Sequence, residues 1–427
     1  MRYPDKLSTL IGLPFLILLL GGCSGVFCGT ETYTYTETVP VYVQKSEMNK
    51  VESRAPRDLV EPGKIYLHND LILINEVDEG IHVLDNSDPK NPVALSFIAV
   101  PGNHDLLVRE DETHRVLYAD NYTDLVALDF SDPKEVRVLK RVEDVFVDFY
   151  PQPVDEEIGP ELFLADYEEG EEITETYRDC GGFVEDSPVA SPAPSPGNGG
   201  GEGASQGGSL ARFAAIENFL YAVNGDEIQS FRLASLDDPV VFNSTYVDFG
   251  IETLFAYGRE SGNQLYVGGN QGMYIMDASD PQNLRKEGEI THVQSCDPVV
   301  VQGDLAYVTL QGSCFGQSNR LEIIDVSDAS SPELIVDYAL QEPYGLGVDG
   351  DYLFVCDGAA GLKVYENAKD PKNLDLITQL DEVRARDVIP FNTIAIVIAE
   401  NGFFQYDYSN LAEGEMTLLS SILVAEE

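Results

Sequence analysis

The feature that most constrains the fold is a repeat of roughly 44 residues that runs through most of the chain. Each copy has a short apolar strand, a turn, a second strand that usually ends in Asp, an Asp-rich turn and a third strand. The apolar strands that open the copies begin at Leu71, Val116, Leu162, Phe219, Leu265, Leu305, Tyr352 and Ile394. One such unit cannot bury both of its faces alone, so neighbouring copies have to pack on each other.

Units with three or four short strands, apolar on both faces, are typical of the blades of a β-propeller. Closing the ring also leaves few exposed sheet edges, which an open stack of such strands would not achieve. Tyr, Phe, Val and Ile carry the strands, and helical periodicity is nearly absent. We therefore predict an all-β fold, a single β-propeller of seven or eight four-stranded antiparallel blades, with an open solenoid as the alternative.

The third copy, at Leu162, is irregular. It is followed by an acidic stretch and then, within residues 180–209, by the runs SPAPSPG and GGGEGASQGG, which predict a disordered Pro/Gly/Ser-rich insertion loop. One degraded blade with an insertion explains the long spacing to the next copy, so we favour eight blades. Seven blades remain the alternative if the irregular unit gives its strands to a neighbour.

The turn after the second strand recurs almost unchanged along the chain. It reads Asp85–Pro89, Asp129–Pro133 and Asp277–Pro281, with a looser copy at Asp370-Pro371. Asp and Ser side chains can bind local backbone groups while Pro fixes φ, so these residues are expected to shape turns and to have no catalytic role.

The N-terminus has the features of an export signal. Arg2 and Lys6 precede the apolar run Leu10–Leu20, which is short for a membrane span, so residues 1–22 are predicted to be a signal peptide. The sequence Leu20-Gly21-Gly22-Cys23 resembles the lipobox of bacterial lipoproteins, which implies that Cys23 carries the lipid. An uncleaved N-terminal anchor is the alternative.

The predicted organisation follows from these signals. Residues 23–58 form a lipid-anchored tether that can add one strand, and residues 59–424 form the propeller. We expect an extracytoplasmic protein attached to the cell envelope by its lipid. Ser24 does not resemble an inner-membrane retention signal, which by analogy favours the outer membrane or the cell surface.

The charge of the chain excludes some partners. Asp and Glu number 74 against 26 Lys and Arg, for a formal charge of −48, so a phosphate backbone or an anionic membrane face would be repelled. We expect no nucleic-acid partner, a monomeric protein, and a protein or glycan ligand of unknown identity.

Six cysteines are present, and five remain if Cys23 is acylated. Cys296 and Cys314 flank an expected hairpin with strands Val299–Val301 and Leu305–Thr309, so we predict a disulfide between them. Cys356 lies in an apolar strand and is expected to act as a small buried hydrophobe. The sequence does not assign Cys28 or Cys180.

The segment Leu321-Glu322-Ile323-Ile324-Asp325-Val326-Ser327-Asp328 is similar to the repeat signature of the LVIVD-repeat proteins, and Leu125–Asp129 and Met276–Pro281 look like further copies. The resemblance covers roughly residues 59–424, including segments similar to lipid-anchored members from the Bacteroidota and their relatives. It implies a β-propeller on the cell envelope. It implies no catalytic residues.

Polar residues recur directly before the strands that we expect to be innermost. Loops entering the innermost strands of a propeller converge on one mouth of the central channel. The candidates for binding a cation or a polar ligand there are His104, Asp105, Glu252, Asp297, Tyr344, Arg386 and Asp387. Polar residues at such positions also cap strand ends or hold water, and this interpretation stays open.

Common catalytic signatures are missing from the sequence, which has no zinc-type Cys and His spacing, no GxxxxGK[ST] loop and no GxSxG elbow. We therefore predict a binding module without a required cofactor, leaving calcium open as a ligand. The alternative is an enzyme acting on a small polar or glycan substrate, with His104 or Asp387 as base and Arg386 holding an anion.

Overall fold

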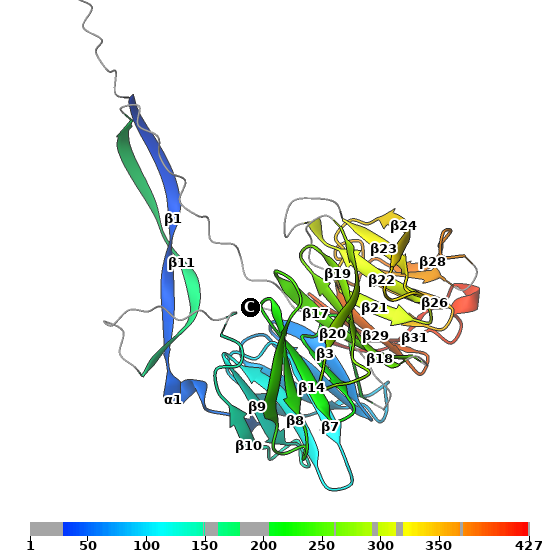
Figure 1. Cartoon of the computed structure of the whole chain (residues 1–427), viewed down its shortest axis with the longest axis horizontal. Helices are drawn as coiled ribbons and strands as arrows, with labels where there is room; N and C mark the ends of the chain where they lie inside the picture. Colours follow the sequence, from blue (N-terminus) through cyan, green and yellow to red (C-terminus); the bar gives the residue numbers. More distant parts are fainter. Residues whose placement is uncertain are drawn as a thin grey trace, which may run out of the picture. The chain divides into compact units, whose positions relative to one another are not determined.

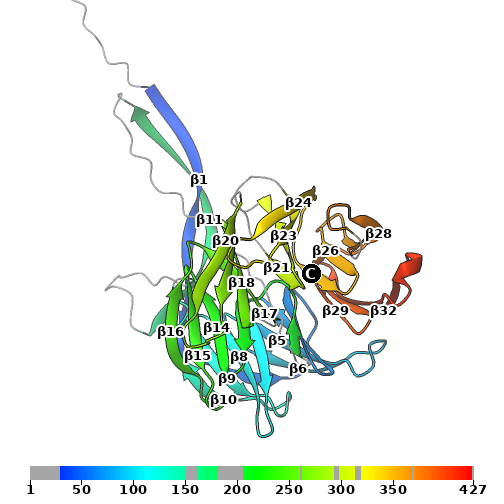
Figure 2. The same cartoon turned by 45° about the vertical axis from the view of Figure 1, so that its right-hand side comes forward.

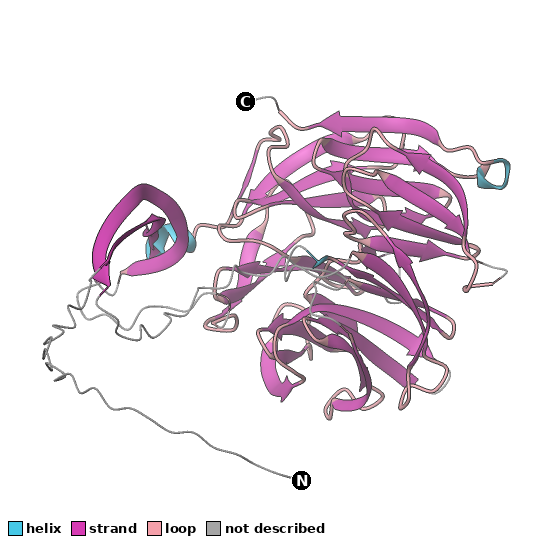
Figure 3. Ribbon diagram, turned by 90° about the horizontal axis from the view of Figure 1, so that it is seen from above, coloured by secondary structure: helices cyan, strands magenta, loops and turns pink. Residues whose placement is uncertain are grey.

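The computed structural model describes residues 29–147, 149, 161–179, 205–259, 262–292, 298–312, 319–367 and 370–425. The chain divides into two units, one formed by Met1–Val39 with Tyr167–Ser191 and the other by Pro40–Asp166 with Pro192–Glu427. Strands dominate the described chain (Figure 3), and its helical elements are the short α1 (Lys45–Met48) and η2 (Leu411–Glu413). Among these residues, no helix has the length and apolar character needed to cross a membrane.

Seven of the eight sheets formed by the described residues are antiparallel blades in which strands adjacent in sequence pair with each other (Figures 1 and 2). Blade 1 holds β3 (Pro62–His68), β4 (Leu71–Glu76), β5 (Gly80–Asp85) and β6 (Val93–Ala99). Blade 2 holds β7 (Leu106–Glu110), β8 (Arg115–Asn121), β9 (Asp124–Asp129) and β10 (Arg137–Val142). Blade 3 holds β13 (Phe213–Ile216), β14 (Phe219–Asn224), β15 (Glu227–Arg232) and β16 (Val240–Tyr246).

The remaining four blades repeat this order. Blade 4 holds β17 (Ile251–Arg259), β18 (Gly262–Gly269), β19 (Gly272–Asp277) and β20 (Arg285–Thr291). Blade 5 holds β21 (Val299–Gln302), β22 (Leu305–Leu310), β23 (Arg320–Asp325) and β24 (Glu333–Ala339). Blade 6 holds β25 (Leu346–Asp349), β26 (Tyr352–Cys356), β27 (Leu362–Glu366) and β28 (Asp375–Leu380), and blade 7 holds β29 (Ala385–Phe391), β30 (Ile394–Ala399), β31 (Gly402–Asp407) and β32 (Thr417–Leu423).

The eighth sheet is a two-stranded ribbon of β1 (Gly29–Gln44) and β11 (Leu162–Asp179). The predicted all-β propeller is confirmed, and all eight predicted strand starts lie in strands. The third copy, however, lies in β11 and forms no four-stranded blade, so its sheet is not equivalent to the other seven. The physical reason is the acidic run that follows Asp166, because such charges cannot be buried between two blades.

Blade 1 is extended on both sides. On its inner side β12 (Ser205–Gly207) pairs with β3, and on its outer side β2 (Glu52–Arg54) pairs with β6. Residues 205–209 were predicted to belong to the insertion loop, but they are ordered against the inner strands because they find unpaired backbone groups there. The predicted tether supplies two strands, β1 and β2, instead of one.

The first strands of consecutive blades contact each other in the order β3, β7, β13, β17, β21, β25, β29 and back to β3, so they form the inner wall of a closed ring. Closure between the last and first blades includes a parallel bridge between Leu59 and Val424. The buried Gln405 in β31 donates from Nε2 to Asn86 Oδ1 at 2.8 Å, and Asn86 Nδ2 donates back to Gln405 Oε1 at 2.9 Å.

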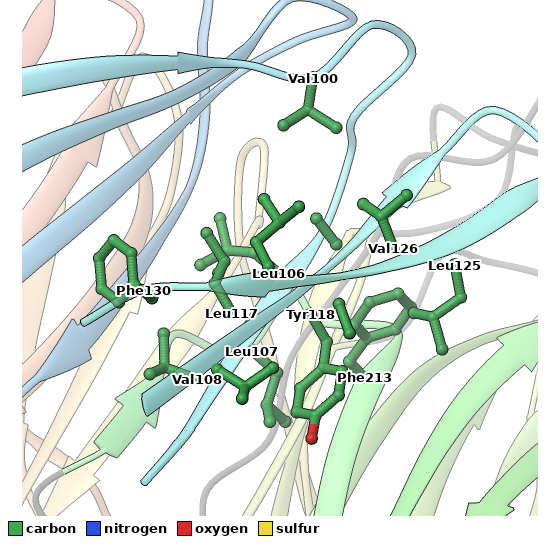
Figure 4. Packing of buried hydrophobic residues seen from close by; sticks show 14 of the residues in the cluster. Val100, Leu106, Leu107, Val108, Leu117, Tyr118, Leu125, Val126, Phe130 and Phe213 are labelled. Carbon is green, nitrogen blue, oxygen red and sulfur yellow. The ribbon is translucent and has the colours of Figure 1, made fainter. Parts of the chain in front are cut away.

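Apolar side chains from neighbouring blades fill the spaces between the sheets. In one large cluster (Figure 4), Leu117 and Tyr118 of β8 are fully buried together with Phe213 of β13. Tyr118 Oη also donates to the carbonyl of Leu236 at 2.6 Å, which satisfies its polar end in the turn of the next blade.

The recurring Asp turns have the predicted structural role. Asp85, Asp129, Asp277, Asp325 and Asp407 each accept a hydrogen bond from the backbone N–H two residues later. The backbone bond holds the pKa of Asp85 below its ordinary value. Each blade also has a β-bulge between its third and fourth strands, which increases the local twist at the outer edge.

Candidate functional site

The described candidates lie at the entrances of the innermost strands, as predicted. His104 and Asp105 directly precede β7, Glu252 lies in β17, Tyr344 precedes β25, and Arg386 and Asp387 lie in β29. Asp297 lies outside the described residues, as do Cys23, Cys296 and Cys314, so the lipid site and the disulfide stay predictions. Cys356 is free and buried, which confirms its predicted place in the core.

A short segment of the chain crosses the entrance of the channel. We call residues Gly208–Arg212 the channel plug. Gly208 N–H donates to Ile65 O of blade 1 at 3.3 Å, Leu254 N–H of blade 4 donates to Ala211 O at 3.0 Å, and Leu346 N–H of blade 6 donates to Ser209 Oγ at 2.7 Å. The plug therefore connects inner strands from several blades.

Asp105 holds one end of the plug. Its Oδ2 accepts hydrogen bonds from the backbone N–H groups of Arg212 and Phe213, the latter at 3.0 Å. The same oxygen lies 3.1 Å from Lys64 Nζ, and both side chains are almost completely buried. Burial raises the pKa of Asp105 despite the neighbouring ammonium, and burial lowers the pKa of Lys64 to about 8.

Asp387 holds the other part of the plug. Its Oδ1 accepts from Ser209 N and Ser209 Oγ, both at 3.1 Å, and from Val388 N at 2.9 Å. Its Oδ2 is buried and has no hydrogen-bond partner among the described residues. Burial raises the pKa of Asp387 to about 7, because the ionised form would place a charge in this closed site.

Two glycines allow the close approach of the plug to Asp387. A Cβ atom at Gly208 or at Gly345 would overlap the Asp387 carboxylate. These positions therefore require glycine for space.

Three candidates lie nearer to solvent. The Arg386 guanidinium lies 4.8 Å from the centre of the Tyr344 ring, and its Nη2 is 2.7 Å from Glu400 Oε1. Burial is the main cause of the raised pKa of Tyr344. His104 Nε2 lies 3.0 Å from Asp78 Oδ1, and its side chain is 22% exposed.

The candidate set is thus divided between two environments. Asp105, Asp387 and Glu252 are buried, and the first two direct carboxylate oxygens at the plug, whereas His104, Tyr344 and Arg386 keep some access to solvent. The described residues contain no group of three or more His, Cys, Asp or Glu that could hold a metal ion.

Sequence reasoning missed Lys64, Ser209 and Arg212 as members of this network. Lys64 could have been found from the sequence, because it directly precedes the apolar strand segment Ile65–Leu67. The contacts of Ser209 could not be read from the sequence, because it meets Asp387 across 178 residues.

The family comparison supports the repeat interpretation. The LVIVD repeat model matches residues 261–290 and 295–339, which cover most of blade 4 and all the strands of blade 5. The chain is therefore a β-propeller that carries LVIVD repeats. No curated protein matches the sequence.

Solved structures support the architecture. A candidate 6-phosphogluconolactonase of Bacteroides fragilis is 11% identical, with a TM-score of 0.55 over 86% of this chain and 97% of its own. A candidate 6-phosphogluconolactonase of Bacteroides uniformis is 12% identical, with a TM-score of 0.56 over 85% and 97%. A periplasmic gluconolactonase of Pseudomonas aeruginosa is 10% identical, with a TM-score of 0.53 over 88% and 97%. At these identities the likeness shows the fold alone.

The buried ion pair yields a test of the structural role of Asp105. We expect Asp105→Ala to lower the free energy of unfolding by about 3 kcal/mol, because Lys64 and two backbone N–H groups lose their acceptor. The adjacent variant His104→Ala, at a partly exposed position, should change it by about 0.5 kcal/mol or less. Urea unfolding of both variants measures the difference, and equal effects would contradict the role assigned to Asp105.

Proposed function

We propose that the protein is an extracytoplasmic, lipid-anchored β-propeller that acts as a binding or interaction module at the cell envelope. The observation that carries this proposal is that the two carboxylates at the channel entrance are hydrogen-bonded within the protein. Asp105 and Asp387 accept hydrogen bonds from the plug residues Arg212 and Ser209, so their oxygens serve the internal structure. Recognition is then expected on the outer surfaces and loops of the blades.

The outer strand of blade 3 offers a surface suited to a protein partner. Val240, Val241 and Phe242 of β16 are exposed large apolar residues, and β16 carries no charged side chain. Tyr246 at its end and Phe249 beyond it are 62% and 61% exposed. In a chain with a formal charge of −48, such a stretch is suited to the apolar centre of a protein interface.

A photo-crosslinking residue at position 246 tests this surface in cells that express the full chain. We expect a photo-crosslinking residue in place of Tyr246 to form a discrete adduct with a protein partner, because the side chain at this position is exposed at the apolar surface. The same residue at Leu376, which is 50% exposed on the outer strand β28, is the matched control. Equal adducts at both positions, or adducts at neither, would argue against a partner surface at β16.

The lipid anchor is tested separately. We expect the wild-type chain and Cys28→Ser to incorporate radiolabelled fatty acid and to remain in the membrane fraction. Cys23→Ser should lose the label and the membrane association, because the thiol that receives the lipid is gone. Retention of the label by Cys23→Ser would refute the assignment.

A catalytic role is the second candidate function. It is favoured by the partial exposure of His104 and by Arg386, whose side chain is 44% exposed, and by the gluconolactonases among the fold neighbours. If it is correct, the soluble propeller hydrolyses gluconolactone or its 6-phosphate, and His104→Ala with Arg386→Ala lowers kcat/KM by about 100-fold. Lactone hydrolysis at the buffer rate would reject this activity.

A further inference from the structure

The channel plug is held by groups from most of the ring. Besides its bonds to blades 1, 4 and 6, its Arg212 N–H donates to Asp105 ahead of blade 2 and its Ser209 donates to Asp387 of blade 7. Arg212 O also accepts from Val223 N–H of blade 3 at 3.0 Å. The five plug residues therefore close the entrance formed by these inner strands. Any ligand that enters the channel from this end has to displace them.

Asp387 is the side chain whose charge is least compensated in this contact. It is fully buried, its Oδ1 receives all three hydrogen bonds, and its Oδ2 has none among the described residues. A protonated carboxyl group carries no charge into this site, whereas an ionised one leaves a buried charge with half of its acceptor capacity unused.

The neighbouring charges do not balance Asp387. Lys64 of β3 acts on it electrostatically, but the Lys64 ammonium lies against Asp105, which is also close to Asp120 and Arg212. On the side of blade 6, burial is the main cause of the raised pKa of the Cys356 thiol, and the nearby Asp387 and Asp357 raise it further. Asp357 is itself paired with Lys363 at 2.5 Å.

We propose that Gly208–Arg212 is a pH-gated plug of the central channel, held closed while Asp387 is protonated and released as its carboxyl group ionises. Release lets water reach Asp387 and frees the Ser209 hydroxyl from Leu346. Acidic surroundings keep the channel shut, and a rise of pH opens it.

The direction of the effect follows from linkage. With the plug closed the pKa of Asp387 is about 7, whereas a hydrated aspartate titrates near about 4, so the closed form binds the proton more tightly. The ratio of open to closed plug therefore rises by up to about tenfold per pH unit between these two values and levels off above the higher one. Between pH 5.5 and 8 the increase is about 30-fold.

Cys356 is a natural reporter for this opening. It is completely buried in β26, and its backbone N–H donates to the carbonyl of Gly345 at 2.9 Å. Gly345 in turn lies against the side chains of Asp387 and Ser209. The Cys356 side chain packs in the apolar cluster between blades 6 and 7, so we expect a thiol reagent to reach it only when these inner strands loosen after the plug has left. Peptide mass spectrometry separates its labelling from that of the other cysteines.

The experiment measures the labelling rate of Cys356 in the full chain from pH 5.5 to 8, divided by the rate of the unfolded chain at each pH. The ratio should rise about 30-fold in the wild type. In Asp387→Asn it should lose most of its pH dependence, because the side chain at 387 no longer titrates and only Asp105 and Lys64 remain as titrating groups at the plug. Ser209→Ala should label faster at every pH and keep the wild-type slope, because it loses bonds to Asp387 and Leu346.

Hydrogen exchange on the same samples separates plug opening from global unfolding, since a peptide covering Leu117–Asp120 in blade 2 should stay equally protected throughout. A flat wild-type profile overturns the proposal. A profile in Asp387→Asn as steep as in the wild type also overturns it. If Asp387→Asn does not fold, the wild-type profile and the parallel profile of Ser209→Ala decide the question.

Discussion

Each blade buries apolar side chains on both faces, and the ring has to close before the first and last blades can do so. The cluster around Leu117, Tyr118 and Phe213 shows the principle between blades 2 and 3. The same requirement joins blade 7 to blade 1, where Ile72 and Ile74 of β4 pack with Ile396 and Ile398 of β30. Apolar burial supplies most of the driving force for such contacts, so we expect the ring to fold and unfold cooperatively.

Polar groups determine how neighbouring blades of this apolar ring are aligned. The Asp turns order the connections at the outer end of the third strands, and several of them also receive bonds from the preceding blade. Gln405 and Ser420, for example, both donate to Pro89 O across the closure, at 3.1 and 2.7 Å. These bonds fix the register of one blade on the next, which apolar contacts alone do not specify.

The channel entrance contains buried charged side chains, whereas apolar side chains fill the spaces between the blades. Strand entrances bring Lys64, Asp105 and Asp387 into a region without access to water, and buried charges of this kind are tolerated when they are paired or neutralised. Asp105 is paired with Lys64 and with backbone donors, whereas Asp387 meets the plug with one oxygen. The plug thus supplies hydrogen-bond donors to both of these carboxylates.

The repeat, the apolar strands and the Asp turns are local features, and the sequence by itself determined the all-β class, the propeller and the positions of the strands. The entrance positions of His104, Asp105, Glu252, Tyr344, Arg386 and Asp387 followed from the same periodicity. Only the tertiary structure decided that the third copy joins β1 in a ribbon and that Gly208–Arg212 fills the channel entrance. Both results depend on contacts between residues far apart in the chain, such as Ser209 with Asp387, and no local pattern of hydrophobicity or turn residues encodes such a pairing.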